Sequence, residues 1–311
     1  MNDAQEKTLV ALLPACLLGA LLNWSILYSI RRLPSFRHSF GYLSANQALS
    51  DALHSTCFLL YFCPMVLLDS PFMKAYSRHC GFFLYLCYEV SVCTHLVMSL
   101  NRFFAAWTPC HYRKVFSDDK TKIVIILVWL YTGTTSVLFF QTFCQFYYDD
   151  VTQFLTFTAT EFCGNIAQYG VFLKNAAIVA FIMVMDVTTV YKVHQSTKKL
   201  SKSLKGDSNH SKREIRFLKQ TVFQGGVFMF ELSTYFFVPK YFENKWAVFF
   251  ATSFAWVAVH AADGIVVMIF NPEIRKFLLS RGKSVQNTSS MKSRTTMSFV
   301  NSSTIPQSPN Q

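Results

Sequence analysis

Charged and histidine side chains lie within otherwise apolar stretches of this chain. The acids are Asp51, Glu89, Asp186, Glu231 and Asp263, and the histidines are His54, His95 and His260. A charge inside a lipid bilayer costs about 2.5–3.5 kcal/mol on insertion scales, so each of these groups requires a partner or a function. Carboxylates and imidazoles can bind metal ions, relay protons or contact a polar ligand.

Two kinds of membrane protein use such groups for chemistry of their own. A zinc hydrolase would hold the metal with histidine and carboxylate ligands and activate a water molecule. Its ligands usually come in pairs at short helical spacing, whereas the three histidines stand singly on three different stretches. An ion channel or transporter would use the acids as an ion path, and this class stays open as an alternative. We expect no enzyme activity and no transition metal.

Seven apolar segments must position these side chains. They cover about 8–30, 42–68, 81–106, 122–143, 166–191, 217–239 and 246–270. Each reaches the roughly 20 residues that a helix needs to cross a bilayer core. The chain is 52% hydrophobic and 15% charged, and the apolar runs do not alternate as the strands of a barrel would. The sequence therefore predicts an all-α membrane protein, a bundle of seven transmembrane helices.

The positive charges predict the orientation of this bundle. Of the 29 Lys and Arg residues, 23 fall on one side of the expected membrane. The other side has six, which are Lys7, Lys74, Arg78, Lys174, Lys240 and Lys245. Positively charged loops stay in the cytosol, so we expect residues 1–7 outside the cell and the C-terminus inside. This topology accounts for most of the formal charge of +12, and nucleic acid is not expected as a partner. An outward N-terminus also argues against odorant channels of the insect type, whose seven helices run the other way.

Several motifs resemble those of the rhodopsin-like G protein-coupled receptors. The matching positions are 46–51 in helix two, Asn101-Arg102-Phe103 at the end of helix three, Pro109 and Tyr112 in the next loop, Trp129 in helix four and Asp263 in helix seven. Asn101 stands where that family has an acid beside the arginine. The ionic restraint that this acid supplies in a resting receptor is therefore expected to be absent.

More closely, the chain resembles the nematode serpentine chemoreceptors of class X. The supporting strings are Ser99-Leu100-Asn101-Arg102-Phe103, Cys144-Gln145-Phe146-Tyr147-Tyr148, Phe172-Leu173-Lys174-Asn175 and Phe270-Asn271-Pro272-Glu273-Ile274-Arg275. The resemblance implies a chemosensory receptor of the plasma membrane, with the sensory cilium as a further expectation. Such a receptor binds a small molecule from outside and activates a heterotrimeric G protein. Arrestin, a receptor kinase and membrane lipid are the other partners that the resemblance implies.

For G protein coupling and activation, the resemblance points to Asn101, Arg102, Phe103, Pro109 and Tyr112. An arginine at the inner mouth of helix three carries a permanent charge and several fixed donors, which suit it to bind neighbouring helices or a docked partner helix. The alternative role for Arg102 is an anchor that extends its charge to the membrane surface.

The resemblance also implies a sodium site and no other cofactor. Asp51 and Asp263 stand at the two positions that flank the sodium pocket in rhodopsin-like receptors, and Ser91 matches a third ligand position. Na⁺ would relieve the repulsion between the two acids. Alternatively, one acid is protonated and shares a hydrogen bond with the other or with His260.

A ligand pocket is expected between the outer halves of helices three, five, six and seven. Glu89 and Tyr235 are its candidate residues, and Glu231 presents the same choice as Glu89 between a ligand contact and a buried hydrogen-bonding group. Asp186, near the inner end of helix five, is expected to be exposed to water and structural.

The resemblance further predicts a short amphipathic helix eight over residues 271–281, with Asn271, Pro272 and Arg275 at the turn into it. The segment 282–311 is rich in Ser, Thr, Asn and Pro and predicts a disordered cytoplasmic tail.

Cys80, Cys144 and Cys163 fall on the expected outer face, where oxidation is permitted. These three thiols allow one bridge. The general receptor pattern would join Cys80 to the second outer loop, whereas the class X strings favour Cys144 with Cys163, and we incline to the second pairing.

Overall fold

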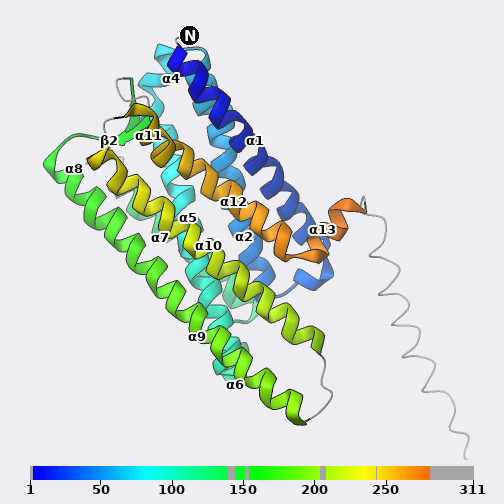
Figure 1. Cartoon of the computed structure of the whole chain (residues 1–311). Helices are drawn as coiled ribbons and strands as arrows, with labels where there is room; N and C mark the ends of the chain where they lie inside the picture. The colour runs from blue at the N-terminus through cyan, green and yellow to red at the C-terminus, as the bar shows by residue number, and fades with distance from the viewer. Residues whose placement is uncertain (1–2, 139–143, 151–153, 204–207, 243, 281–311) are drawn as a thin grey trace, which may run out of the picture.

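The computed structural model describes residues 3–138, 144–150, 154–203, 208–242 and 244–280 of the 311. Long helices run side by side and form one bundle, with the N-terminus at one end (Figure 1). The predicted tail over 282–311 lies outside the described residues. Residues 3–7 of the predicted N-terminal segment 1–7 are described, and they form the first turns of α1.

The first half of the bundle contains the first four transmembrane segments. Its elements are α1 (Asp3–Arg32), η1 (Pro34–Phe36), α2 (Ser39–Cys57), η2 (Phe58–Phe62), α3 (Cys63–Leu67), α4 (Pro71–Ala75), α5 (Ser77–Trp107), α6 (Pro109–Val115) and α7 (Asp118–Ser136). The segment η2 is π-helical and joins α2 to α3 without a break. The N-terminus of α7 is capped by Ser117, whose Oγ accepts a hydrogen bond from the backbone of Lys120.

The second half begins with two strands and continues as helices. Its elements are β1 (Phe146–Asp149), β2 (Phe154–Phe157), α8 (Glu161–Asn165), η4 (Ile166–Leu173), α9 (Lys174–Ser203), α10 (Ser208–Tyr241), α11 (Lys245–Phe249), η5 (Phe250–Phe254), α12 (Ala255–Phe270) and α13 (Pro272–Leu279). The segments η4 and η5 are also π-helical and run directly into α9 and α12.

Five helical stretches in the described part of the chain are long and apolar enough to cross a membrane. They are Thr8–Arg32, Ser39–Leu67, Ser77–Trp107, Glu161–Ser196 and Lys245–Phe270. The helices α7 and α10 complete the bundle, and both begin with a charged stretch that lowers their mean hydropathy. The predicted helical membrane bundle is confirmed.

The two strands form an antiparallel hairpin that the sequence did not predict. Phe146 pairs with Phe157 and Asp149 with Phe154. The backbone N–H of Tyr148 donates to Ser77 Oγ at 3.1 Å, which ties the hairpin to the start of α5. Gly81 permits this approach, because a Cβ there would lie 2.1 Å from the carbonyl oxygen of Phe146.

A disulfide between Cys144 and Cys163 closes the chain around the hairpin. Cys80 is a free thiol, and its Sγ lies 3.6 Å from Cys57 Sγ.

A lysine also holds this end of the molecule together. Lys74, on α4, forms ion pairs with Asp69 and with Asp150 at the end of the hairpin, at 2.6 and 2.5 Å. Burial alone would lower the pKa of Lys74, but the hydrogen bonds to Asp150 and Asp69 outweigh it and raise this pKa above its ordinary value.

Candidate functional site

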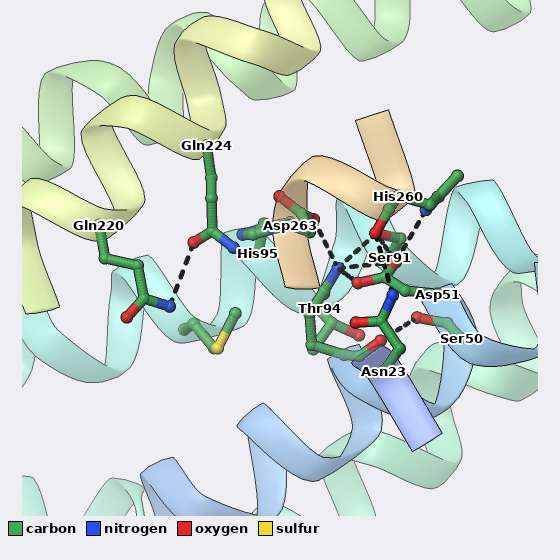
Figure 2. Close-up of polar contacts among 12 residues, drawn as sticks. Asn23, Ser50, Asp51, Ser91, Thr94, His95, Gln220, Gln224, His260 and Asp263 are labelled. Carbon is green, nitrogen blue, oxygen red and sulfur yellow. Dashed lines mark hydrogen bonds and ion pairs between the residues drawn. The ribbon is translucent and has the colours of Figure 1, made fainter. Parts of the chain in front are cut away.

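Six buried polar side chains meet in the middle of the bundle. They come from α2, α5 and α12, and we call Gln47, Asp51, Ser91, His95, His260 and Asp263 the central polar cluster. Figure 2 shows Asp51, Ser91, His260 and Asp263 close together between these helices. The three residues predicted to hold sodium are therefore brought together.

Each carboxylate of the cluster pairs with a histidine from another helix. His260 Nδ1, on α12, lies 2.8 Å from Asp51 Oδ1 on α2. His95 Nε2, on α5, lies 3.1 Å from Asp263 Oδ2 on α12. Ser91 Oγ donates a further hydrogen bond to Asp51 Oδ1 at 3.0 Å. A hydrogen bond between Asp51 and His260 is one of the two that the alternative to a sodium ion allows.

Gln47 was missed by sequence reasoning, although it precedes Asp51 by one helical turn and so shares its face. Its Nε2 lies 3.2 and 3.1 Å from the two Asp51 oxygens, 2.5 Å from Ser91 Oγ and 3.4 Å from Asp263 Oδ2. A side-chain amide nitrogen has only two hydrogens to donate to these four oxygens. The nitrogen lies among the same oxygens that would coordinate a cation.

The third intramembrane histidine has a different environment. Among the described residues, neither ring nitrogen of His54 has a hydrogen-bond partner. The ring lies 3.8 Å from His260 and 4.8 Å from Trp256 between centroids, so His54 packs as part of a cluster of rings. In the part of the chain that the structure describes, no three His, Cys, Asp or Glu residues are arranged to hold a metal ion.

Arg102 lies at the opposite end of α5 from the N-terminus of that helix and is buried. Its Nη2 forms an ion pair with Asp186 Oδ1 on α9 at 3.2 Å, and Ser99 Oγ donates to the same oxygen at 2.9 Å. The expectation that Asp186 is exposed to water is wrong, because its exposed fraction is 0%. Asp186 lies on the side of α9 that faces α5, and its contacts with Ser99 and Arg102 bury it.

Asn101 contacts the loop that follows α5. Its Nδ2 donates to Ser39 Oγ on α2 and to Tyr112 Oη on α6, both at 3.3 Å, and these two oxygens lie 2.7 Å apart. Pro109 occupies the first turn of α6, and the Phe103 ring stacks on Trp107 with centroids 5.7 Å apart. The residues predicted for coupling therefore surround one end of α5.

A narrow aromatic cavity lies between α5, α10, α12 and the hairpin. Its lining residues are Tyr85, Tyr88, Phe146, Phe157, Val171, Glu231, Leu232, Tyr235, Phe236 and Trp256. Tyr235 was predicted as a pocket residue. Trp256, Phe146 and Phe157 were not, although Trp256 precedes His260 by one helical turn and so shares its inward face.

Glu89 does not line this cavity. Lys174 Nζ, on α9, donates to Glu89 Oε2 at 2.5 Å, and Asn175 Nδ2 donates to Glu89 Oε1 at 2.8 Å. Glu89 therefore ties α5 to α9. Lys174 and Asn175 belong to a string used for the class X resemblance, but nothing in the sequence placed them opposite Glu89.

The predicted helix eight corresponds to α13. Pro272 occupies its first turn after Asn271, where a proline costs no hydrogen bond. Arg275 Nη1 donates to the carbonyl oxygens of Met268 and Ile269 at 3.4 and 3.1 Å, which fixes α13 to the end of α12.

Comparison with known proteins gives consistent results. The family model for the "Serpentine type 7TM GPCR chemoreceptor Srx" matches residues 13–271. Serpentine receptor class X 45 of Caenorhabditis elegans is 28% identical over 281 residues, which are 84% of this chain and 77% of that protein. Serpentine receptor class X-43 of the same nematode is 25% identical over 283 residues, covering 89% and 87%. Squid rhodopsin superposes with a TM-score of 0.72 at 18% identity, covering 89% of this chain and 85% of that one, and shows the fold.

Proposed function

Because the chain belongs to the serpentine class X family of seven-helix chemoreceptors, we propose that it binds a small molecule at one end of the bundle and activates a heterotrimeric G protein at the other. The family and the fold are those of receptors rather than enzymes. In a cell the receptor spans the plasma membrane with the aromatic cavity toward the outside and Arg102 toward the cytosol. Arrestin and a receptor kinase act on the cytoplasmic side.

The observation that carries this proposal is that one helix, α5, contributes side chains to the sites at both ends of the bundle. Tyr85 and Tyr88 of α5 line the aromatic cavity, and Arg102 of the same helix forms the buried ion pair with Asp186. At 1.5 Å per residue, the two sites are about 20 Å apart along the helix axis. A ligand that shifts α5 relative to α9 or α10 therefore acts on the Arg102 end as well.

The mechanism is a population shift between two arrangements of the bundle. In the structure described here, Asp186 satisfies the charge of Arg102 inside the bundle. In the second arrangement the pair opens and the Arg102 guanidinium becomes available to a G protein. Ligand and G protein both favour this second arrangement, so each increases the affinity for the other.

Arg102→Ala tests the coupling role. In reporter cells screened with odorants, pheromone-like lipids and ions, we expect the response to an active compound to fall at least about tenfold, because one charge-assisted contact is worth about 1.5–3 kcal/mol. Arg78→Ala is the matched control, since Arg78 is an exposed arginine at the opposite end of α5. Cell-surface amount is measured for every variant by antibody labelling.

An undiminished response in Arg102→Ala would contradict the coupling role. Ligand-gated current in a lipid bilayer without any G protein would instead support a channel.

We also propose that the central polar cluster binds Na⁺ when the Gln47 side chain turns away. The carboxylates of Asp51 and Asp263 and the hydroxyl of Ser91 are the hard oxygen ligands that such an ion requires. The amide nitrogen of Gln47 competes for the same oxygens. The two histidines that pair with these acids compete in the same way when they are protonated.

Replacing Gln47 with leucine should therefore make the stability of the receptor depend on sodium. We expect the thermal midpoint of Gln47→Leu to rise by a few degrees when NaCl replaces KCl at constant ionic strength, because a ligand at 100 times its Kd stabilises by about 2.7 kcal/mol. The rise should disappear in Gln47→Leu combined with Asp263→Asn. Equal midpoints in NaCl and KCl for Gln47→Leu would exclude the sodium site.

A further inference from the structure

Glu231 differs from the other acids inside the bundle. Four of the five acids have a basic partner within 3.2 Å, in the pairs Asp51 with His260, Glu89 with Lys174, Asp186 with Arg102 and Asp263 with His95. Within the described residues Glu231 forms no ion pair. Its Oε2 accepts a hydrogen bond from Tyr88 Oη at 3.4 Å, and its exposed fraction is only 4%.

The Glu231 side chain lines the aromatic cavity. A buried carboxylate costs several kcal/mol without a positive partner, and a single long hydrogen bond from a neutral hydroxyl offsets little of that cost. Since none of the described residues supplies a cation for Glu231, the cavity is the place from which one can come.

The walls of the cavity are suited to a cation as well. Seven of the ten lining residues are aromatic, and several of their rings are in mutual contact. The Trp256 ring lies 6.0 Å from Tyr88 and 5.5 Å from Phe146, and Phe146 lies 4.6 Å from Phe157, between centroids. Faces of such rings attract an ammonium group, most strongly when water is excluded.

Size and access limit the ligand further. In the arrangement described, the cavity has a free volume of about 30 Å³, far below that of a typical small-molecule site, so a ligand enters only when the surrounding rings move apart. The hairpin lines the cavity with Phe146 and Phe157, and Tyr235 Oη donates to the carbonyl oxygen of Leu155 on the hairpin at 3.4 Å. A small organic group requires the least movement of these rings, and a large peptide requires the most.

We infer that the aromatic cavity binds a small organic cation, an amine or a quaternary ammonium compound, whose charge pairs with Glu231 and contacts the faces of Tyr88 and Trp256. This inference rests on the proposed function for the statement that the cavity is the ligand site. It adds the chemical class of the ligand, because a neutral odorant or a lipid would leave Glu231 without a positively charged partner.

The experiment compares cations with neutral molecules of the same shape. The purified full-length receptor in lipid nanodiscs, with no G protein present, is titrated with choline against 3,3-dimethylbutan-1-ol, and with 2-phenylethylamine against 2-phenylethanol. We expect the Kd of at least one cation to be tenfold or more below that of its neutral counterpart. Binding is measured by calorimetry and by the shift of the thermal midpoint.

Variants assign the binding to the cavity. Glu231→Gln keeps the shape of the side chain and should weaken binding of the cation at least about 30-fold, while leaving the neutral counterpart unchanged. Trp256→Leu should weaken binding of the cation about fivefold or more. Phe230→Leu is the control, because Phe230 neighbours Glu231 on α10 but its ring is 70% exposed and points away from the cavity.

The inference is overturned if neither cation binds more tightly than its neutral counterpart, or if Glu231→Gln leaves the preference intact. If a variant does not fold, the comparison of each cation with its neutral counterpart on the wild-type receptor still tests the inference. Coupling is measured separately by nucleotide exchange on added G protein. Tight cation binding without nucleotide exchange would support the inference and contradict the proposed function. Nucleotide exchange without a preference for the cation would overturn the inference and support the proposed function.

Discussion

Asp186→Asn should raise the activity of the receptor in the absence of any ligand. The change removes the negative charge that Arg102 pairs with at 3.2 Å and leaves that arginine buried. Losing one partner of a buried ion pair costs about 3–5 kcal/mol, and the amide oxygen that remains as an acceptor reduces this to about 2 kcal/mol. The cost falls on the arrangement that contains the pair, so the equilibrium moves about 30-fold toward the arrangement that couples.

In numbers, a receptor that is about 1% active at rest would become about 25% active. The measurement is ligand-independent nucleotide exchange by a reconstituted heterotrimeric G protein, normalised to the amount of folded receptor. Asp119→Asn is the control, because Asp119 forms an exposed ion pair with Lys122. Exchange by Asp186→Asn at the level of the wild type would show that the pair does not restrain the receptor.

Of the substitutions proposed for this receptor, those that remove the disulfide between Cys144 and Cys163 should cause the largest loss of thermal stability. The bond between Cys144 and Cys163 closes a loop with a sequence separation of 19 residues. By the chain-entropy model, such a loop contributes about 3 kcal/mol, since cross-linking reduces the freedom of the unfolded chain. We expect Cys144→Ser combined with Cys163→Ser to lower the thermal midpoint by roughly 5 °C.

Reduction provides an independent measurement of the same effect. A reductant should lower the midpoint of the wild type to that of the double variant and should not change the double variant itself. Cys110→Ser serves as the control, because Cys110 is an exposed free thiol on α6. An unchanged midpoint in the double variant would show that Lys74 and the contacts of the hairpin hold this segment without the disulfide.

The sequence predicted the helices well because their signal is local. A run of about 20 apolar residues requires a helix in lipid whatever its neighbours are. The predicted span near 81–106 lies inside α5, and the turn at Asn271 and Pro272 leads into α13 as expected. The hairpin was missed because strands of four residues carry too weak a pattern, and it is specified by contacts with Ser77 and Gly81 on α5.

The site was predicted less completely because pairing depends on how helices rotate against each other. The acids could be identified one by one, yet no spacing indicates that Asp186 meets Arg102 or that Lys174 meets Glu89. The error at Asp186 has the same cause, because its burial follows from the contacts with Ser99 and Arg102 on α5. Glu231 was recognised as a choice between a ligand contact and a buried group, and its lack of a basic partner emerges only when the other four pairs are known.

The π-helical segments let the sequence at the cavity end of the molecule change in evolution more freely than the sequence at the Arg102 end. The segments η4 and η5 lie at the level of the aromatic cavity, and η4 contributes Val171 to its lining. A π-helical turn holds more residues than an α-helical turn, so deletion of one residue there restores an α-helix. Because the extra residue is accommodated within the π-helical turn, its loss changes the side chains of that turn and leaves the rest of the helix in register. A single codon lost in either segment would therefore present new side chains at the rim of the cavity, while Arg102, Asp186 and the inner surface keep their register.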